Sequence, residues 1–254
     1  MSALYDEKEE KKYVFVKKLT CTNCGRDIED LRVLNSKLRR MEPDADLRPR
    51  FHYIDTLKYG VTSCRCCGYS ALTKNFENLT QLQKRYLVEK VSSHFYEREP
   101  FKGEVMDYES AIQMYQLALL CAISMELKTS EQAYLCLQLS WLLRGSIEEG
   151  EAEPGGMPQE EKKQKKEQEE RFYRQAYDGL SQALLEEDFP ICGMDEGTFE
   201  YLLAVLSFHF KEYDVATKYC GNVVQNRSVS AKLKDKALML KDDILAAKKE
   251  EGEA

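Results

Sequence analysis

The spacing of apolar residues along the chain changes close to Leu79. Before that point, short β-prone runs lead into two cysteine-containing turns: 13–16 precedes the first, 28–34 is available to pair with it, and 53–61 alternates loosely before the second. From Leu79 onward, apolar residues follow the 3.6-residue period of a helix. The pattern predicts an α+β fold that is mostly α, with a small β-rich module over 13–75 and a helical domain over 79–249.

The helical period divides the second part of the chain into separate helices. Glu99-Pro100 is expected to end the first of them, because the residue before a proline avoids the α region, and Gly145 is expected to end the third. Four residues can serve as N-caps: Asp107, Ser130, Asp195 and Ser230. The predicted helices cover 79–97, 107–127, 130–144, 160–187, 195–210, 213–226 and 230–249.

Small and apolar residues recur at spacings of four and three in three of these helices. Small residues at that spacing let an antiparallel partner helix pack closely. We interpret the recurrence as the tail of a tetratricopeptide-like pattern of helix pairs, about 34 residues each, with 230–249 as a polar capping helix. An ordinary helical bundle is the alternative. The triplets are Ala111–Tyr115–Ala118, Ala176–Leu180–Ala183 and Ala216–Cys220–Val223.

Two charged segments lack an apolar pattern. Residues 1–12 form a charged leader, which we expect to be frayed because chain ends order poorly unless they are tied down. Residues 146–159 are acidic and rich in glycine and proline. This composition cannot bury a core, so it predicts a mobile loop that a protease would cut first.

Composition and charge narrow the class of protein. Of the 254 residues, 43% are hydrophobic and 32% are charged, which suits a soluble globular protein rich in exposed helix. Residues 1–75 hold 15 Lys and Arg against 11 Asp and Glu, so the remainder carries −11 of a formal net charge of −7. The sequence lacks an apolar run of about 18 residues and a signal-peptide core. We therefore expect no membrane association, and a cytoplasmic location that keeps nine cysteines reduced.

Two short cysteine motifs carry the strongest chemical signal. Both 21–25 and 64–68 contain the motif C-x-x-C-G. This spacing puts two thiolates on one tight turn, and the glycine lets the backbone bend so that its N–H groups face the sulfurs. Two such turns supply one tetrahedral structural zinc site, with Cys21, Cys24, Cys64 and Cys67 as ligands. The alternatives are ordinary buried cysteines, a redox pair or disulfides. A redox motif would need a βαβ setting, and disulfides are disfavoured without a secretory signal.

Two details complicate the metal assignment. The gap from Gly25 to Ser63 is about twice the roughly 15–20 residues of common zinc ribbons, so it must carry structure of its own. Cys66 is a spare thiol that could replace Cys64 or Cys67 as a ligand. A second metal site is also conceivable, because a carboxylate pair with an imidazole suits many divalent ions; a solvated acidic turn is the interpretation that we favour. Its residues would be Asp44, Asp46 and His52.

Taken in order, these features resemble the bacterial family catalogued as domain of unknown function 2225. The resemblance implies a zinc ribbon followed by helical repeats, and no established activity. Thr22 and Arg65 stand where that family often has proline, and 47–53 is a looser match to its aromatic-rich segment. The resemblance is carried by Cys21-x-x-Cys24-Gly25, Ser36-Lys37-Leu38-Arg39, Asp44-x-Asp46, Cys64-x-x-Cys67-Gly68-Tyr69-x-Ala71, Ala133 with Trp141-Leu142-x-Arg144, and Thr198-x-x-Tyr201-Leu202.

Two classes of function remain, because the sequence lacks G-x-S-x-G, P-loop and H-E-x-x-H motifs and we expect no enzyme. The first is an interaction or scaffold protein that holds a protein or peptide on its helices, with Tyr134, Gln138 and Tyr201 as candidate lining. The alternative is nucleic-acid binding by the basic zinc module. It requires that the basic side chains share one face without the interspersed carboxylates. Its candidate residues are Arg26, Arg32, Lys37, Arg39, Arg40, Arg48, Arg50, Phe51 and Tyr53.

Overall fold

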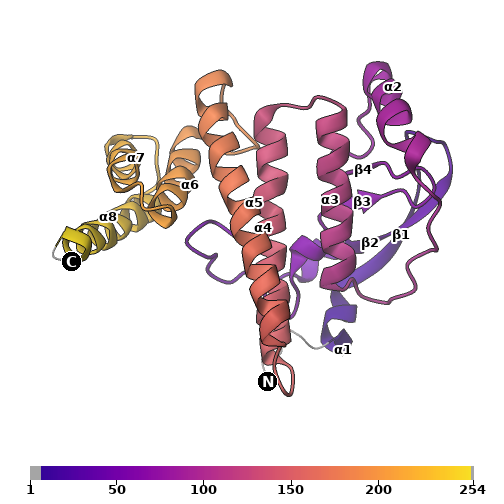
Figure 1. Cartoon of the computed structure of the whole chain (residues 1–254), viewed down its shortest axis with the longest axis horizontal. Coiled ribbons are helices and arrows are strands. Elements are labelled where there is room, and N and C mark those ends of the chain that lie inside the picture. The colour runs from indigo at the N-terminus through magenta and orange to yellow at the C-terminus, as the bar shows by residue number, and fades with distance from the viewer. Residues whose placement is uncertain (1–6, 253–254) are drawn as a thin grey trace.

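Three long helices form the centre of the molecule in the computed structural model, which describes residues 7–252 (Figure 1). α3 packs on α4 and α4 packs on α5, so the three stand side by side. Two small sheets and α2 lie against α3 on the side away from α5. These helices span Gln81–Lys90 (α2), Tyr108–Ser124 (α3), Thr129–Ala152 (α4) and Gln159–Glu186 (α5).

Three further helices continue the row beyond α5 (Figure 1). They are α6 (Glu196–His209), α7 (Tyr213–Gln225) and α8 (Ala231–Gly252), and each packs on the next. The fold is therefore α+β and mostly α, as the apolar pattern predicted. Along residues 7–252, no helix combines the length and the apolar character needed to cross a membrane.

Each of the two sheets is an antiparallel hairpin. In the first, β1 (Val14–Thr20) pairs with β2 (Asp27–Val33), which confirms the pairing predicted for 13–16 and 28–34. In the second, β3 (Val61–Ser63) pairs with β4 (Ser70–Leu72). The strand predicted over 53–61 is wrong for most of its length. Thr56–Tyr59 forms a 3₁₀ turn (η4) because Asp55 accepts a hydrogen bond from the backbone N–H of Leu57 and caps it.

The predicted helix starts are confirmed at three of four positions. The side chains of Asp107 and Asp195 accept hydrogen bonds from the third residue of α3 and α6, and Ser230 does so for α8. Ser130 lies inside α4, where Glu187 accepts hydrogen bonds from its backbone N–H and hydroxyl. The first helix is shorter than predicted: α2 ends at Lys90, and short 3₁₀ (η5, Ser92–His94) and irregular segments follow it.

α4 continues well past Gly145, where the sequence predicted its end. Gly145 is buried in the middle of the helix, and a Cβ on it would lie 2.6 Å from the Tyr108 ring and 2.7 Å from the Arg48 guanidinium. The glycine therefore serves close packing rather than termination. As a result, 146–152 of the predicted mobile loop is helical, and only 153–158 connects α4 to α5.

The three predicted triplets lie at helix contacts, as their spacing predicted. Every one of their nine residues is at most 1% exposed. The last triplet belongs to a separate core formed by α6, α7 and α8, which also contains Tyr201. The helices pack in succession, and their assignment as tetratricopeptide-like repeats stays a prediction.

The predicted β-rich module shares the central core with the helices. Ile54, Leu57, Tyr59 and Val61 pack with residues of α3, α4 and α5 in one hydrophobic cluster. The proposed boundary between 13–75 and 79–249 therefore does not separate two cores. Independent folding of the two parts stays a prediction.

The described part of the predicted leader is helical rather than frayed. Residues 7–12 form α1 (Glu7–Glu10) and the start of η2 (Lys11–Tyr13). Glu10 is 3% exposed, and its carboxylate accepts hydrogen bonds from the Lys58 ammonium at 2.8 Å and the Tyr59 hydroxyl at 2.7 Å. The rest of that prediction, 1–6, lies outside the described residues.

Candidate metal centre and the adjoining groove

Each hairpin turn holds one cysteine pair, and the two turns have the same backbone pattern. In the first, the Gly25 N–H donates to the Cys21 carbonyl at 2.8 Å; in the second, the Gly68 N–H donates to the Cys64 carbonyl at 2.9 Å. Both glycines have a left-handed φ, 74° and 76°, which a side chain would disfavour. The C-x-x-C-G motif therefore encodes the turn as well as the thiols.

The two turns face each other and bring four sulfurs together. The Sγ atoms of Cys21, Cys24, Cys64 and Cys67 all lie within 4.8 Å of one another. Across the turns, Cys21 Sγ is 3.8 Å from Cys67 Sγ, and Cys24 Sγ is 3.6 Å from Cys64 Sγ. A tetrahedral ion with metal–sulfur bonds of about 2.3 Å requires sulfurs about 3.8 Å apart. The group could therefore hold a metal ion, since the two distances across the turns are close to this value.

The four-cysteine group is the centre of a second hydrophobic core. Three of its members are at most 6% exposed, and only Cys24 reaches the surface. Leu87 and Val91, in and just after α2, pack around it together with Cys121 and Met125 from α3. The centre thus joins both hairpins to two helices.

The thiols of this group shift one another's pKa values. Hydrogen bonds from Cys21 and Cys64 lower the pKa of the Cys67 thiol well below its usual value, and the hydrogen bond with Cys21 raises the pKa of Cys64 above its usual value. Asn23 adds a further donor, its Nδ2 lying 3.4 Å from Cys67 Sγ. Four thiolates this close together would repel one another, so a cation at the centre of the group would be needed to keep all four deprotonated.

Cys66 lies outside this group. Its Sγ faces Glu97, 3.6 Å from Oε1, on the outer side of the second turn, and it is half-buried. Of the three cysteines in the second motif, the pair Cys64 and Cys67 faces the first turn. The structure therefore agrees with the predicted spacing and leaves Cys66 as the spare thiol.

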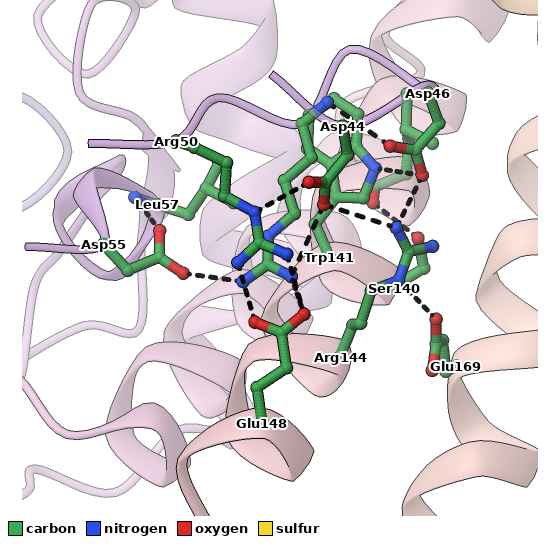
Figure 2. A network of polar contacts seen from close by, with 12 residues as sticks. Asp44, Asp46, Arg50, Asp55, Leu57, Ser140, Trp141, Arg144, Glu148 and Glu169 are labelled. Carbon is green, nitrogen blue, oxygen red and sulfur yellow. Dashed lines mark hydrogen bonds and ion pairs between the residues drawn. The ribbon is translucent and has the colours of Figure 1, made fainter. Parts of the chain in front are cut away.

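Asp44 and Asp46 belong to a polar network rather than to a second metal site. Figure 2 shows the loop that carries them lying against α4 and α5. The Asp46 carboxylate accepts hydrogen bonds from Trp141 Nε1 at 2.9 Å, Arg144 Nη1 at 2.9 Å and the Tyr173 hydroxyl at 3.1 Å. His52 is exposed, and its ring lies beside that of Tyr53.

Two further arginines of the loop are bound on the other side of the network. Arg48 is 1% exposed and donates to Asp55 at 3.0 Å and Glu148 at 3.1 Å. Arg50 donates to Asp44 at 2.8 Å and to both oxygens of Glu148 at 2.7 Å (Figure 2). Burial alone would raise the pKa of Glu148, but the two guanidiniums outweigh it and hold that pKa below its usual value. Because these arginines have carboxylate partners, they are not available to an external phosphate.

The remaining candidate basic residues divide into two groups. Arg26 pairs with Glu97 at 2.7 Å, and Arg32 pairs with the buried Asp30. Lys37 and Arg39 lie at a shallow surface, and Arg40 lines a groove. Of the basic side chains proposed for nucleic-acid binding, Arg32 and Arg40 line the same groove, and four already have acidic partners: Arg26, Arg32, Arg48 and Arg50.

The groove lies between the hairpins, η3 (Asn35–Lys37) and α4, with a volume of about 900 Å³. Four cations line it: Lys17, Arg32, Arg40 and Lys74; among the described residues that line it, none is acidic. Tyr134 and Gln138, which the sequence offered as lining of a binding surface on the helices, lie in this groove. The third candidate, Tyr201, is 3% exposed inside the C-terminal core, so its predicted position is wrong.

Sequence reasoning missed Lys17 and Lys74 as groove residues. Lys17 stands on β1 and Lys74 just after β4, so only the placement of the two hairpins side by side in the folded chain brings them together. The alternation on β1 is a partial signal, since Phe15 and Lys17 share one face of that strand.

The fold and the centre define the chain as an α+β protein with two cysteine-bearing hairpins, a four-cysteine group able to hold a metal and a row of helices. The chain belongs to the family described as "Uncharacterized protein conserved in bacteria (DUF2225)", which matches residues 14–244. The resemblance predicted from the ordered motifs is thereby confirmed. Neither a curated protein nor a solved structure matches the chain.

Proposed function

We propose that this protein is a non-enzymatic binding protein, in which one structural zinc ion fixes the hairpins and a groove beside α4 holds a protein or peptide segment. The groove carries this proposal. It is lined from four separate parts of the fold, including the β1–β2 hairpin and α4, and it combines cations with the aromatic rings of Phe15, Phe51 and Tyr134. Such a mixture of polar and apolar groups in a concave surface is typical of binding sites.

The metal part of the proposal rests on the sulfur geometry. Four thiolates complete a tetrahedral sphere, which is the pattern of structural rather than catalytic zinc. Cys21, Cys24, Cys64 and Cys67 would hold the ion, and its charge would let all four thiols stay deprotonated. A reducing compartment such as the cytoplasm suits this chemistry, because oxidation removes thiolate ligands.

The position of the groove explains how the metal could affect the binding of a partner. The centre and the groove share the two hairpins: β1 leads into Cys21 and also carries Phe15 and Lys17 into the groove. A bound ion that locks the turns would therefore also hold one wall of the groove. We infer that metal loss weakens partner binding without contact between metal and partner.

Peptide display on the full-length protein tests the proposed function. Selected peptides should bind the wild type and lose affinity when Asn35→Trp fills the groove mouth, whereas Gln225→Trp at the exposed end of α7 should leave binding unchanged. Addition of a chelator should weaken the same peptides. Selection of single-stranded nucleic acid in preference to every peptide would contradict the proposal.

A further inference from the structure

The groove has a distinct charge pattern. Lys17 and Lys74 are exposed, as is Arg40, and within residues 7–252 neither Arg40 nor Lys74 forms an ion pair. Lys17 has one carboxylate within reach, Glu77 at 3.9 Å, and Arg32 is already paired with Asp30. Among the described residues, Arg40 and Lys74 therefore have no competing carboxylate, and Lys17 has only a long, exposed ion pair with Glu77 that a ligand carboxylate could replace, in a protein whose formal net charge is −7.

A second pocket adjoins the groove. It has a volume of about 300 Å³ and shares Leu72, Lys74 and Tyr134 with the groove. Its other walls include the apolar side chains of Ala118, Ala122, Met125 and Leu135 and the polar side chains of Asn75, Asn78, Gln83 and Glu131. One large apolar side chain entering this pocket would remain within reach of Lys74.

One polar group of the groove lacks a partner. Gln138 is 8% exposed, and its Oε1 receives no hydrogen bond from any described residue. A buried acceptor without a donor is costly. An extended peptide supplies backbone N–H donors at regular intervals along its length.

We propose that the groove binds an acidic peptide segment whose carboxylates pair with Lys17, Arg40 and Lys74 and whose single large apolar side chain fills the adjoining pocket. This inference rests on the proposed function and adds the chemistry of the partner. The helical part carries most of the negative charge and would repel a long polyanion wherever that polyanion passes within a Debye length of it, roughly 8–10 Å, whereas a short segment stays next to the cations.

Fluorescence anisotropy with the full-length protein tests the inference. The probe is a fluorescein-labelled short peptide of Asp and Glu around one central Phe. Arg40→Glu and Lys74→Glu should each weaken its binding by at least about tenfold, because each removes a charged hydrogen bond. Arg227→Glu, an equally exposed arginine at the turn between α7 and α8, is the matched control and should leave binding unchanged. Circular dichroism of each variant checks that it is folded.

Changes in the probe test the two halves of the site without altering the protein. Replacement of every carboxylate by an amide should abolish the salt dependence of binding, and replacement of the central Phe by Gly should cost about tenfold or more. A single-stranded oligouridylate that binds more tightly than the peptide, and that Arg40→Glu weakens equally, would overturn the inference in favour of nucleic acid.

Failure of the inference differs from failure of the proposed function. Suppose that the peptides selected by display bind less tightly to the Asn35→Trp variant, but contain no acidic residues and bind the Arg40→Glu variant as tightly as the wild type. This result would overturn the acidic partner alone. If Asn35→Trp changes the binding of none of the selected peptides, both the groove and the acidic partner are wrong.

Discussion

At the residue scale, the cysteines of the second turn divide into metal-facing and outward-facing thiols. Cys64 and Cys67 face the first turn, whereas Cys66 lies beside Glu97. Removal of a metal-facing thiol should therefore cost the protein its metal, whereas removal of the outward-facing Cys66 should not. The same contrast separates Cys24, a member of the group, from Cys66, although both are more accessible than the other three.

Cys24→Ser should lose bound zinc and destabilise the hairpins, because metal binding supplies part of the folding free energy of such a site. Cys66→Ser is the control and should retain one ion per chain. Metal analysis by mass spectrometry of the purified proteins measures both, and it also separates zinc from iron, the other ion that suits four thiolates. Full zinc retention by Cys24→Ser would show that the four cysteines are not the ligands.

Gly145→Ala should lower the free energy of unfolding by about 1–2 kcal/mol, because overpacking against buried neighbours costs more than the helix gains from alanine. The neighbours, Tyr108 and Arg48, are held by hydrogen bonds to Asp55 and cannot easily move aside. Gly221→Ala, inside α7 with nothing within 4 Å of its Cβ, should instead stabilise the protein. Urea denaturation compares the pair; equal effects of both substitutions would remove the close-packing explanation.

Glu148→Gln should destabilise the protein by about 2 kcal/mol at neutral pH, because Arg48 and Arg50 lose a charged partner but keep Asp55 and Asp44. The folded-state pKa of Glu148 lies below its ordinary value of 4.5. The contribution of the ionised Glu148 carboxylate to stability is therefore complete above about pH 4.5, and it is lost as the pH falls through the pKa of Glu148 in the folded protein. Denaturation at a series of pH values should show a constant gap between wild type and variant down to that point, then a narrowing one. A gap that widens in acid would contradict this sign.

At the element scale, α2 depends on the metal centre more than any long helix does. Its capping box, Thr80 with Gln83, sets its start, but its one buried residue is Leu87, which packs in the four-cysteine core. A short helix with so little burial needs its tertiary contact to persist. The stability of α2 should thus follow the occupancy of the centre.

Chelation should speed hydrogen–deuterium exchange in α2 and in both cysteine turns. The amides of α6 and α7 should keep their protection, because those helices pack in the separate C-terminal core. Mass spectrometry of the exchanged peptides measures the difference. Unchanged exchange in α2 after metal removal would show that the helix is held by other contacts.

Elements fixed by local chemistry could be predicted from the sequence. The C-x-x-C-G spacing predicted both turns and the four cysteines that meet, and the Ala-containing triplets predicted buried helix contacts. The continuation of α4 through Gly145 could not be predicted, because the reason for that glycine lies in Arg48 and Tyr108, far away in sequence. The groove was missed in part for the same reason: its cations come from separate segments.

At the scale of the whole molecule, the loop that carries Asp44 to Arg50 adds a contact between the central core and the C-terminal core, beside the direct packing of α5 on α6. Leu47, at its tip with a φ of 67°, packs against both the central core and the C-terminal core. Glu42 pairs with Lys232 at 2.7 Å, on α8. The loop therefore couples the hairpin end of the chain to its last helices.

Leu47→Ala should reduce the cooperativity of unfolding as well as its free energy. We expect a loss of about 1–2 kcal/mol for a half-buried leucine, together with earlier melting of α6 to α8, since one of the contacts joining the two cores is removed. Calorimetry should resolve two overlapping transitions in the variant, and Leu238→Ala, an exposed leucine of α8, should not produce them. A single sharp transition in Leu47→Ala, at a lower temperature, would mean that the cores are coupled elsewhere.

The donors that hold Asp46 have a consequence for synthesis on the ribosome. Trp141, Arg144 and Tyr173 follow Asp46 by 95, 98 and 127 residues. At about 5–20 residues per second, the last of them is translated roughly 6–25 s after the carboxylate that it contacts. Throughout that interval Asp46 stays hydrated, and both cysteine turns are translated before Trp141, the first of these donors. The nascent chain can therefore acquire its metal long before the loop has a surface to rest on.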